Sequence, residues 1–264
     1  MKRENALTKM LSEHHDPVHY YLNLKDDFIL MNEVLGHEIT LEHTGYECKA
    51  CGSDEKIFAH GLCKKCYFEH PMAGEWVLHP EKSTAHLEIE DRDLSFEKEM
   101  QLQPHMVYLA KTSGVKVGVT RKSQVPYRWI DQGADEALPF LEVPNRYLAG
   151  LAEVALKQHI TDKTAWREML TSNKVDVDLE EELEKLIPFL PDEVKPYLLQ
   201  ERKLYKFNYP VLSYPNKIKS VKLDQHKKIE GKPVGIKGQY LIFENGNVFN
   251  IRNHDGYIVK IEIL

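Results

Sequence analysis

Short stretches near both ends of the chain alternate hydrophobic with polar residues or are apolar throughout, as in half-buried and buried β-strands. In the N-terminal part these stretches are residues 18–24, 28–31 and 37–41. Near the C-terminus, residues 240–243 and 248–251 flank Asn245-Gly246, a dipeptide typical of a hairpin with a type I′ turn, and residues 257–263 predict a last strand. We therefore expect β-sheet at both ends of the chain.

The middle of the chain combines a hairpin with helices. Residues 106–110 and 115–120 are mainly apolar and are separated by a short loop that ends at Gly114, which predicts two paired strands. Residues 126–133 predict a short helix or turn. From 144 to 160, apolar residues recur every three or four positions, as on the buried face of an α-helix. Separate stretches of sheet and helix predict an α+β fold.

All four cysteines lie within 19 residues, in the pattern Cys-x2-Cys-x11-Cys-x2-Cys. They are Cys48, Cys51, Cys63 and Cys66. A two-residue gap lets one tight turn point both sulfurs inward, and four thiolates satisfy the tetrahedral coordination of Zn²⁺. A redox pair would not need the second Cys-x2-Cys. This spacing predicts a closed, structural zinc site in a small knuckle.

These patterns divide the chain into four segments. We expect a β-rich zinc-knuckle unit at 1–100, an α+β core at 101–175, an acidic helical connector at 176–203 and a small basic β unit at 204–264. The charged stretch 88–99 is expected at the solvated surface. The connector carries an acidic run whose simplest interpretation is the solvated face of a helix.

Composition and charge narrow the class of protein further. The chain is 42% hydrophobic and 29% charged, which is enough to build packed cores, and its formal net charge is −6. No run approaches the ~18 apolar residues of a membrane span, and no apolar signal region follows the N-terminus. These features predict a soluble, cytoplasmic protein without a membrane partner.

Positive charge is concentrated between residues 202 and 237, a segment that contains ten lysines and arginines but only two acidic residues. The lysines that we expect to contact nucleic acid are Lys217, Lys219, Lys222, Lys227 and Lys228. The interleaved aromatic residues are Tyr205, Phe207, Tyr209 and Tyr214. Cations that neutralise phosphates and rings that stack on bases suit nucleic acid, although the aromatic residues would equally suit the core of a β unit.

The hairpin of the middle segment is expected to place polar side chains together on one face. A loop at 112–114 places Tyr108 opposite Gly118, and Ala110 opposite Lys116; directly opposed residues share a face of the sheet. Arg128 follows ten residues after Gly118, near the start of a predicted helix. Glu153 borders the apolar stripe of the helix at 144–160, where it can face along the sheet.

The order of these residues resembles the GIY-YIG nuclease superfamily over residues 105–170. Val-Tyr-Leu matches its first motif and Lys-Val-Gly-Val-Thr its second, although Met106 stands at a glycine position and Lys116 replaces the second tyrosine. The zinc knuckle followed by this core is similar to a bacterial protein family with an N-terminal four-cysteine knuckle. The resemblance implies that Tyr108, Gly118 and Arg128 belong to the site and that Glu153 binds Mg²⁺.

The resemblance implies hydrolysis of phosphodiesters. Arg128 would bind the phosphate, Lys116 would supply a further cation, and Tyr108 would accept the proton of the attacking water, which requires a lowered pKa. Three further residues are candidates for binding phosphate, namely Arg121, Asn145 and Arg146; the simplest alternative for the last two is helix capping.

Three functions are compatible with these patterns. The first is a Mg²⁺-dependent endonuclease or nucleic-acid processing protein. The second is a non-catalytic DNA- or RNA-binding module on the same fold, and the third is a zinc-stabilised adaptor that binds other proteins. The patterns leave the choice between DNA and RNA and the oligomeric state open.

Overall fold

Strands from the two ends of the chain pair in one antiparallel sheet. In it β17 (Tyr257–Ile263) lies between β1 (Lys2–Ala6) and β5 (Ile39–Tyr46), and β13 (Lys228–Gly231) pairs with the free edge of β5. The four predicted segments separate residues 1–100 from 204–264, whereas this sheet joins them. The difference arises because alternation identifies a strand but not the strand with which it pairs.

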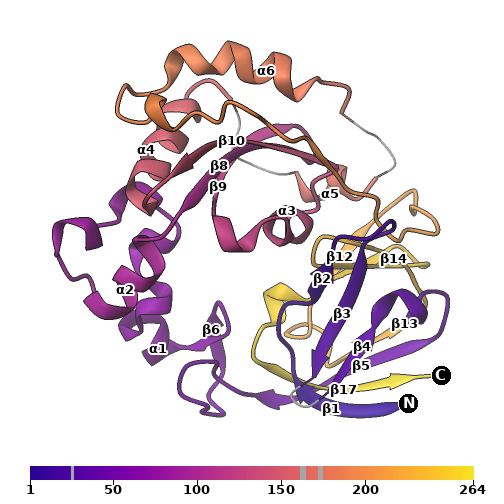
Figure 1. Ribbon diagram of the computed structural model, residues 1–264. Helices are drawn as coiled ribbons and strands as arrows, with labels where there is room; N and C mark the ends of the chain where they lie inside the picture. Colours follow the sequence, from indigo (N-terminus) through magenta and orange to yellow (C-terminus); the bar gives the residue numbers. More distant parts are fainter. Residues whose placement is uncertain (25–26, 161–164, 172–174) are drawn as a thin grey trace. The chain divides into compact units, whose positions relative to one another are not determined.

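The computed structural model describes residues 1–24, 27–160, 165–171 and 175–264 (Figure 1). Parts of the predicted core segment, residues 161–164 and 172–174, therefore lie outside the described residues. The chain forms two compact units. The first combines Met1–Phe68 with Phe207–Leu264, and the second combines Glu69–Met169 with the segment that ends at Lys206.

The first unit contains the other small sheets. One has the order β12-β16-β15-β14, the second the order β2-β3-β4, and the third is the pair β6-β7. Their bounds are β12 (Lys219–Val221), β16 (Asn247–Asn250), β15 (Tyr240–Phe243), β14 (Pro233–Lys237), β2 (Leu11–Glu13), β3 (His19–Leu24), β4 (Asp27–Leu30), β6 (Ile57–Ala59) and β7 (Leu62–Cys63). Helix α1 (Lys64–Glu69) follows β7 directly.

The predicted hairpin around Asn245-Gly246 is confirmed, because β15 pairs antiparallel with β16. The turn differs from the predicted type I′. That turn needs a positive φ at both residues, but only Gly246 has one, at +81°. The loop is also longer than two residues, because β15 ends at Phe243 and β16 begins at Asn247.

The second unit is built on a sheet of order β11-β10-β8-β9 with helices on both faces (Figure 1). Its strands are β8 (His105–Lys111), β9 (Val115–Arg121), β10 (Glu136–Val143) and β11 (Tyr205–Lys206). Its helices are α2 (Leu94–Gln101), α3 (Tyr127–Asp131), α4 (Arg146–Leu156), α5 (Trp166–Met169) and α6 (Leu179–Leu186). Helices and largely antiparallel sheets confirm the α+β class.

One face of this sheet packs on α4 and α6. Apolar side chains of β8, β9 and β10 form a single core with Ala149, Ala152 and Leu156 of α4 and with the leucines of α6. The acidic residues of α6 are exposed or half-buried, as its pattern predicts, but its leucines belong to this core rather than to a connector. On the opposite face, Tyr108 and Trp129 of α3 are wholly buried against each other.

Glu97 of α2 contradicts the prediction that residues 88–99 form a solvated surface. Its side chain is wholly buried, and its carboxylate accepts backbone N–H bonds from Asp91, Arg92 and Asp93 at 2.7–3.1 Å. These bonds replace the water that the charge loses on burial.

Among the helices of the described residues, none is both long and apolar enough to cross a membrane.

Candidate functional site

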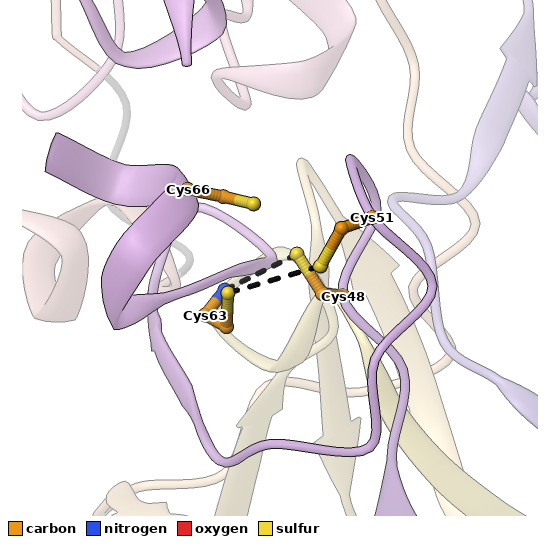
Figure 2. Close-up of side chains that lie close together, drawn as sticks. All are labelled: Cys48, Cys51, Cys63 and Cys66. Atoms are coloured by element: carbon orange, nitrogen blue, oxygen red, sulfur yellow. Dashed lines mark hydrogen bonds between the residues drawn. The ribbon is translucent and has the colours of Figure 1, made fainter. Parts of the chain in front are cut away.

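The four cysteines converge in the first unit (Figure 2). Cys48 and Cys51 lie in the turn after β5, Cys63 ends β7 and Cys66 lies in α1. Their sulfur atoms all lie within 4.8 Å of one another, and the Sγ atoms of Cys51 and Cys63 are 3.9 Å apart. Four sulfurs at this separation can bind a metal ion such as Zn²⁺.

Backbone groups shape this cluster and act on its thiols. Burial raises the pKa of Cys48, but backbone N–H groups of Cys63, Cys51 and Ala50 bond to its sulfur, and the net result is a pKa of about 6. Burial and the neighbouring cysteines raise the pKa of Cys66 to about 12. Metal ions bind thiolates, and a bound cation would favour the thiolate form of Cys66.

A second group of candidate residues lies around the β8–β9 hairpin of the second unit. The register is the predicted one, with Tyr108 opposite Gly118 and Ala110 opposite Lys116. The Tyr108 ring lies directly over Gly118, because a Cβ at that position would be 2.7 Å from both Cζ and the hydroxyl oxygen of Tyr108. Glycine at 118 thus makes the space that the phenol ring occupies.

We expect Gly118→Ala to destabilise the second unit by about 1–3 kcal/mol, the usual cost of overpacking a core. Tyr108 is wholly buried, so its ring can move only if the side chains packed around it move too. Gly114→Ala in the same hairpin is the matched control, since its Cβ would meet nothing within 4 Å. Urea unfolding followed by tryptophan fluorescence measures the difference, because the three tryptophans, Trp76, Trp129 and Trp166, lie in this unit. Equal stability of the two variants would contradict the close packing of Tyr108 on Gly118.

The pKa of the Tyr108 phenol is shifted in the direction opposite to the lowering that the sequence analysis expected. Burial raises the pKa of its phenol, and this effect is larger than the opposing effect of the Arg128 charge. The hydroxyl donates a hydrogen bond to Oε1 of Gln132 at 3.1 Å. The expectation of a lowered pKa considered nearby cations but not the complete loss of water around the ring.

The charges of Arg128 and Glu153 nevertheless act on the Tyr108 phenol. The charge of Arg128 lowers the pKa of Tyr108 and the charge of Glu153 raises it, so both side chains lie within electrostatic reach of the phenol. Lys116 is largely buried on the same face of the hairpin as Tyr108. Tyr108, Lys116 and Gly118 thus share one face of the hairpin, and the charges of Arg128 and Glu153 act on the Tyr108 phenol.

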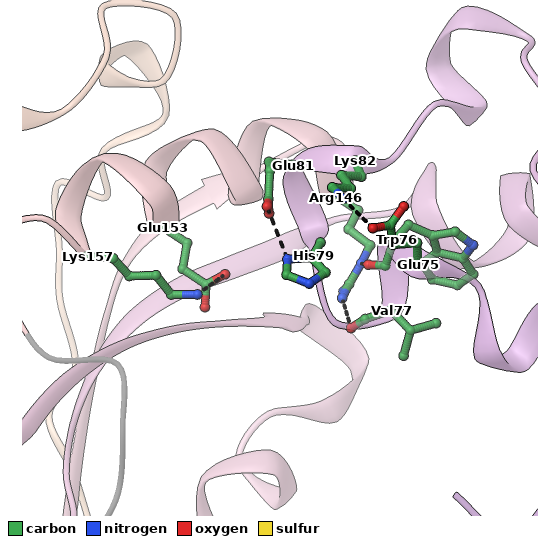
Figure 3. Close-up of polar contacts among 9 residues, drawn as sticks. All are labelled: Glu75, Trp76, Val77, His79, Glu81, Lys82, Arg146, Glu153 and Lys157. Carbon is green, nitrogen blue, oxygen red and sulfur yellow. Dashed lines mark hydrogen bonds and ion pairs between the residues drawn. The ribbon is translucent and has the colours of Figure 1, made fainter. Parts of the chain in front are cut away.

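Glu153 lies on α4 and is largely buried, with 11% of its side chain exposed. Burial raises the pKa of its carboxyl, Lys157 and Arg146 lower it, and the charge of Glu81 raises it further. Nζ of Lys157 lies 3.4 Å from Oε2 of Glu153 (Figure 3). Glu81 comes from the short 3-10 helix Pro80–Lys82, which the sequence patterns did not indicate as part of a site.

Arg146 is half-buried, and its guanidinium forms hydrogen bonds with backbone carbonyls. Its Nε donates to the Trp76 carbonyl at 3.0 Å and its terminal nitrogen to the Val77 carbonyl at 2.8 Å (Figure 3). Burial lowers its pKa to about 10. The segment around Pro80 and Glu81 packs closely on α4 at Gly150. Only glycine allows this approach, because a Cβ at position 150 would lie 2.2 Å from the Glu81 backbone nitrogen.

The other phosphate-binding candidates have local roles. Asn145 caps α4, because its side chain accepts the Leu148 N–H at 2.9 Å, which is the alternative that the sequence allowed. Arg121 ends β9 and contacts the sulfur of Met100 at 3.1 Å. Its charge lowers the pKa of Arg146 and of His105.

The basic lysines do not share one sheet. All five are exposed, but Lys219 lies in β12 and Lys228 in β13, which belong to different sheets of the first unit. Lys228 pairs with Glu230 at 2.7 Å. Of the interleaved aromatic residues, Phe207 and Tyr209 are buried and Tyr205 packs on Trp129 at 4.9 Å, so these three serve as core.

The fold and these sites define an α+β protein with a four-cysteine cluster that can bind a metal such as zinc. The chain belongs to the family described as protein of unknown function (DUF2797), whose sequence profile matches residues 36–259. No curated protein matches the chain. No solved structure matches it either.

Proposed function

We propose that this protein is a metal-dependent endonuclease, or a nucleic-acid processing protein, that hydrolyses phosphodiesters at a GIY-YIG-like site in its second unit. One observation carries the proposal: the charges of Arg128 and Glu153 both act on the buried phenol of Tyr108, although the three residues come from a strand and two different helices. A phenol, a guanidinium and a carboxylate suit proton transfer, phosphate binding and metal binding, respectively.

The chain's own residues would divide the chemistry as follows. The planar guanidinium of Arg128 binds and orients the phosphate, and Lys116 adds positive charge to a transition state rich in negative charge. Tyr108 keeps its proton in the resting site and shares it with Gln132 through a hydrogen bond. To take the proton of an attacking water it must first ionise, and the raised pKa means that cleavage should accelerate with pH through the alkaline range.

Glu153 would hold Mg²⁺, with Glu81 close by. The fit rests on the largely buried carboxyl group of Glu153, whose pKa the charge of Glu81 raises. A divalent cation would relieve this repulsion and would take the place of Nζ of Lys157. When bound, Mg²⁺ supplies a Lewis acid that polarises a phosphoryl oxygen and stabilises the leaving oxygen.

The cysteine cluster would hold a structural Zn²⁺. Four sulfur ligands complete a tetrahedral site and leave no position for a water or a substrate. The metal therefore serves to hold the knuckle, which consists of two short strands and one turn of helix.

The first unit would contribute to binding the nucleic acid. Phe58 and Phe68 are more than half exposed, and with Tyr67 they form a group of rings whose centroids lie 4.9–5.5 Å apart. Exposed rings of this kind stack on unpaired bases, and the exposed Lys64 and Lys65 flank them in sequence. These rings, rather than the buried Phe207 and Tyr209, are the candidates for base stacking.

Cleavage assays on single- and double-stranded DNA and RNA, with Mg²⁺ or Mn²⁺, test the proposal. We expect Glu153→Gln to reduce cleavage at least about 100-fold, because losing one electrostatic stabiliser of a charged transition state costs about 10²–10³ in rate. Glu142→Gln is the matched control, since this glutamate pairs with Lys122 at 2.7 Å in the same unit without approaching Tyr108. Cleavage that survives Glu153→Gln would contradict the proposed site.

A second function, non-catalytic binding of DNA or RNA on the same fold, is favoured by the complete burial of Tyr108. A base that is wholly buried and protonated has poor access to water. This function predicts binding that weakens steeply with salt in samples that show no cleavage. Samples that show neither binding nor cleavage would instead favour the protein-interaction adaptor.

A further inference from the structure

Two histidines and a glutamate gather on a hairpin of the first unit, apart from the cysteine cluster in sequence. Strands β2 and β3 pair antiparallel, and their register places Glu13 directly opposite His19. His15 lies in the loop between these strands. Directly opposed residues of paired strands have neighbouring side chains on one face, so the fold brings a carboxylate and an imidazole together.

The three side chains are close enough to share one metal ion. One ligand atom from each lies within 4.8 Å of the other two. Nε2 of His15 lies 3.3 Å from Oε2 of Glu13, and the rings of His15 and His19 have centroids 4.5 Å apart. The contact of His15 with Glu13 and the strand register of His19 together bring both imidazoles to one carboxylate.

A fourth side chain holds the carboxylate in place. The Tyr21 hydroxyl donates to Oε2 of Glu13 at 2.8 Å, and this bond raises the pKa of the phenol. Partners of this kind orient metal-binding carboxylates in proteins. Glu13 and His15 are exposed and His19 is half-buried, so a metal ion can enter from solvent and retain a coordination position for water.

We propose that Glu13, His15 and His19 form a second metal site, which binds a divalent transition metal such as Zn²⁺. Two imidazole nitrogens and one carboxylate oxygen match ions of intermediate hardness rather than Mg²⁺ or Ca²⁺, which take oxygen ligands. With three protein ligands the site is open, in contrast to a closed site of four thiolates.

The test compares the zinc content of the full-length wild type with that of His15→Ala and His19→Ala after equilibration with buffered Zn²⁺ and gel filtration. We expect each variant to lose about one ion per chain relative to wild type, since two remaining ligands hold Zn²⁺ poorly. His14→Ala is the matched control, because this neighbouring histidine packs on Phe207 and is not part of the cluster. The difference between variants does not depend on how many ions the cysteines bind.

Two further measurements separate this site from the cysteine cluster. Titration of Co²⁺ should give ligand-field bands that His19→Ala removes, while any sulfur-to-cobalt charge-transfer band from the cysteines remains. Tyr21→Phe should weaken binding at the histidine site by about 10-fold or more. Zinc contents that are equal in wild type and both histidine variants would overturn the proposal. So would a loss of zinc in His14→Ala equal to that in His19→Ala.

Discussion

Removal of the proposed Zn²⁺ from the cysteine cluster is expected to unfold the knuckle between Cys48 and Cys66. This segment has only two short strands and one turn of helix, and Ile57 and Leu62 are among its few buried apolar side chains. A structural Zn²⁺ in small zinc-finger peptides contributes about 10–16 kcal/mol at pH 7, which far exceeds what so small a core supplies. Without the ion, four thiols would converge with nothing to bind them.

Hydrogen exchange before and after chelation measures this effect. Backbone amides such as that of Cys63, which bonds to the Cys48 sulfur, should lose protection, and Cys48→Ser should reproduce the loss in the presence of zinc. The sheet of the second unit should keep its protection, because its core contains no residue of the knuckle. Protection of the knuckle that persists after metal analysis shows the zinc removed would contradict the structural role of the metal.

We expect the second unit to lose stability as the pH falls, because of the buried side chain of His105. This side chain is wholly buried in β8, and burial, together with the charges of Arg146 and Arg121, lowers its pKa to about 4. Nδ1 lies 2.7 Å from the Gln103 carbonyl oxygen, and among the described residues none forms a hydrogen bond with Nε2. A proton on Nε2 therefore has no acceptor to stabilise it.

The direction of the effect follows from the proton uptake of each state. Well above pH 6.5 both states hold a neutral His105, and the full stability is present. Between about pH 6.5 and about 4 the unfolded chain takes up a proton that the folded one does not, so the free energy of unfolding falls as the pH falls. At ~1.4 kcal/mol per pH unit, the loss reaches about 3 kcal/mol near pH 4.

Urea unfolding at a series of pH values, followed by tryptophan fluorescence, tests this prediction. His105→Gln should remove this part of the pH dependence, because the group that titrates differently in the two states is gone. His159→Gln should retain it, since that histidine is exposed and stacks on Phe189. An unchanged slope in His105→Gln would show that other groups cause the acid sensitivity.

Two parts of the candidate sites could be predicted because they depend on neighbours in sequence. The paired Cys-x2-Cys spacing implies that the sulfurs converge, and the structure confirms it. The register that places Tyr108 opposite Gly118 follows from the short loop of the hairpin, and the structure confirms this too. In both cases a turn of a few residues determines the geometry.

Other parts depend on contacts that no spacing reveals. Arg146 bonds to the carbonyls of Trp76 and Val77, about 70 residues earlier in the chain. The charge of Glu81 acts on Glu153 because the segment that carries Glu81 packs on α4 at Gly150. The burial of Glu97 depends on three backbone N–H groups that converge on its carboxylate. A pattern of charged residues looks the same whether or not such groups are present.

The local pattern of residues therefore determined many of the strands and helices and the convergence of four thiols. It also determined the pairing of Tyr108 with Gly118 across the hairpin, since all of these require only short-range geometry. The tertiary structure alone decided that β5 lies between β17 and β13, that Tyr108 keeps its proton, and that His15 and His19 meet beside Glu13. The reason is physical. Long-range strand pairing depends on which apolar faces become buried together, and the pKa of a side chain depends on how much water that burial removes.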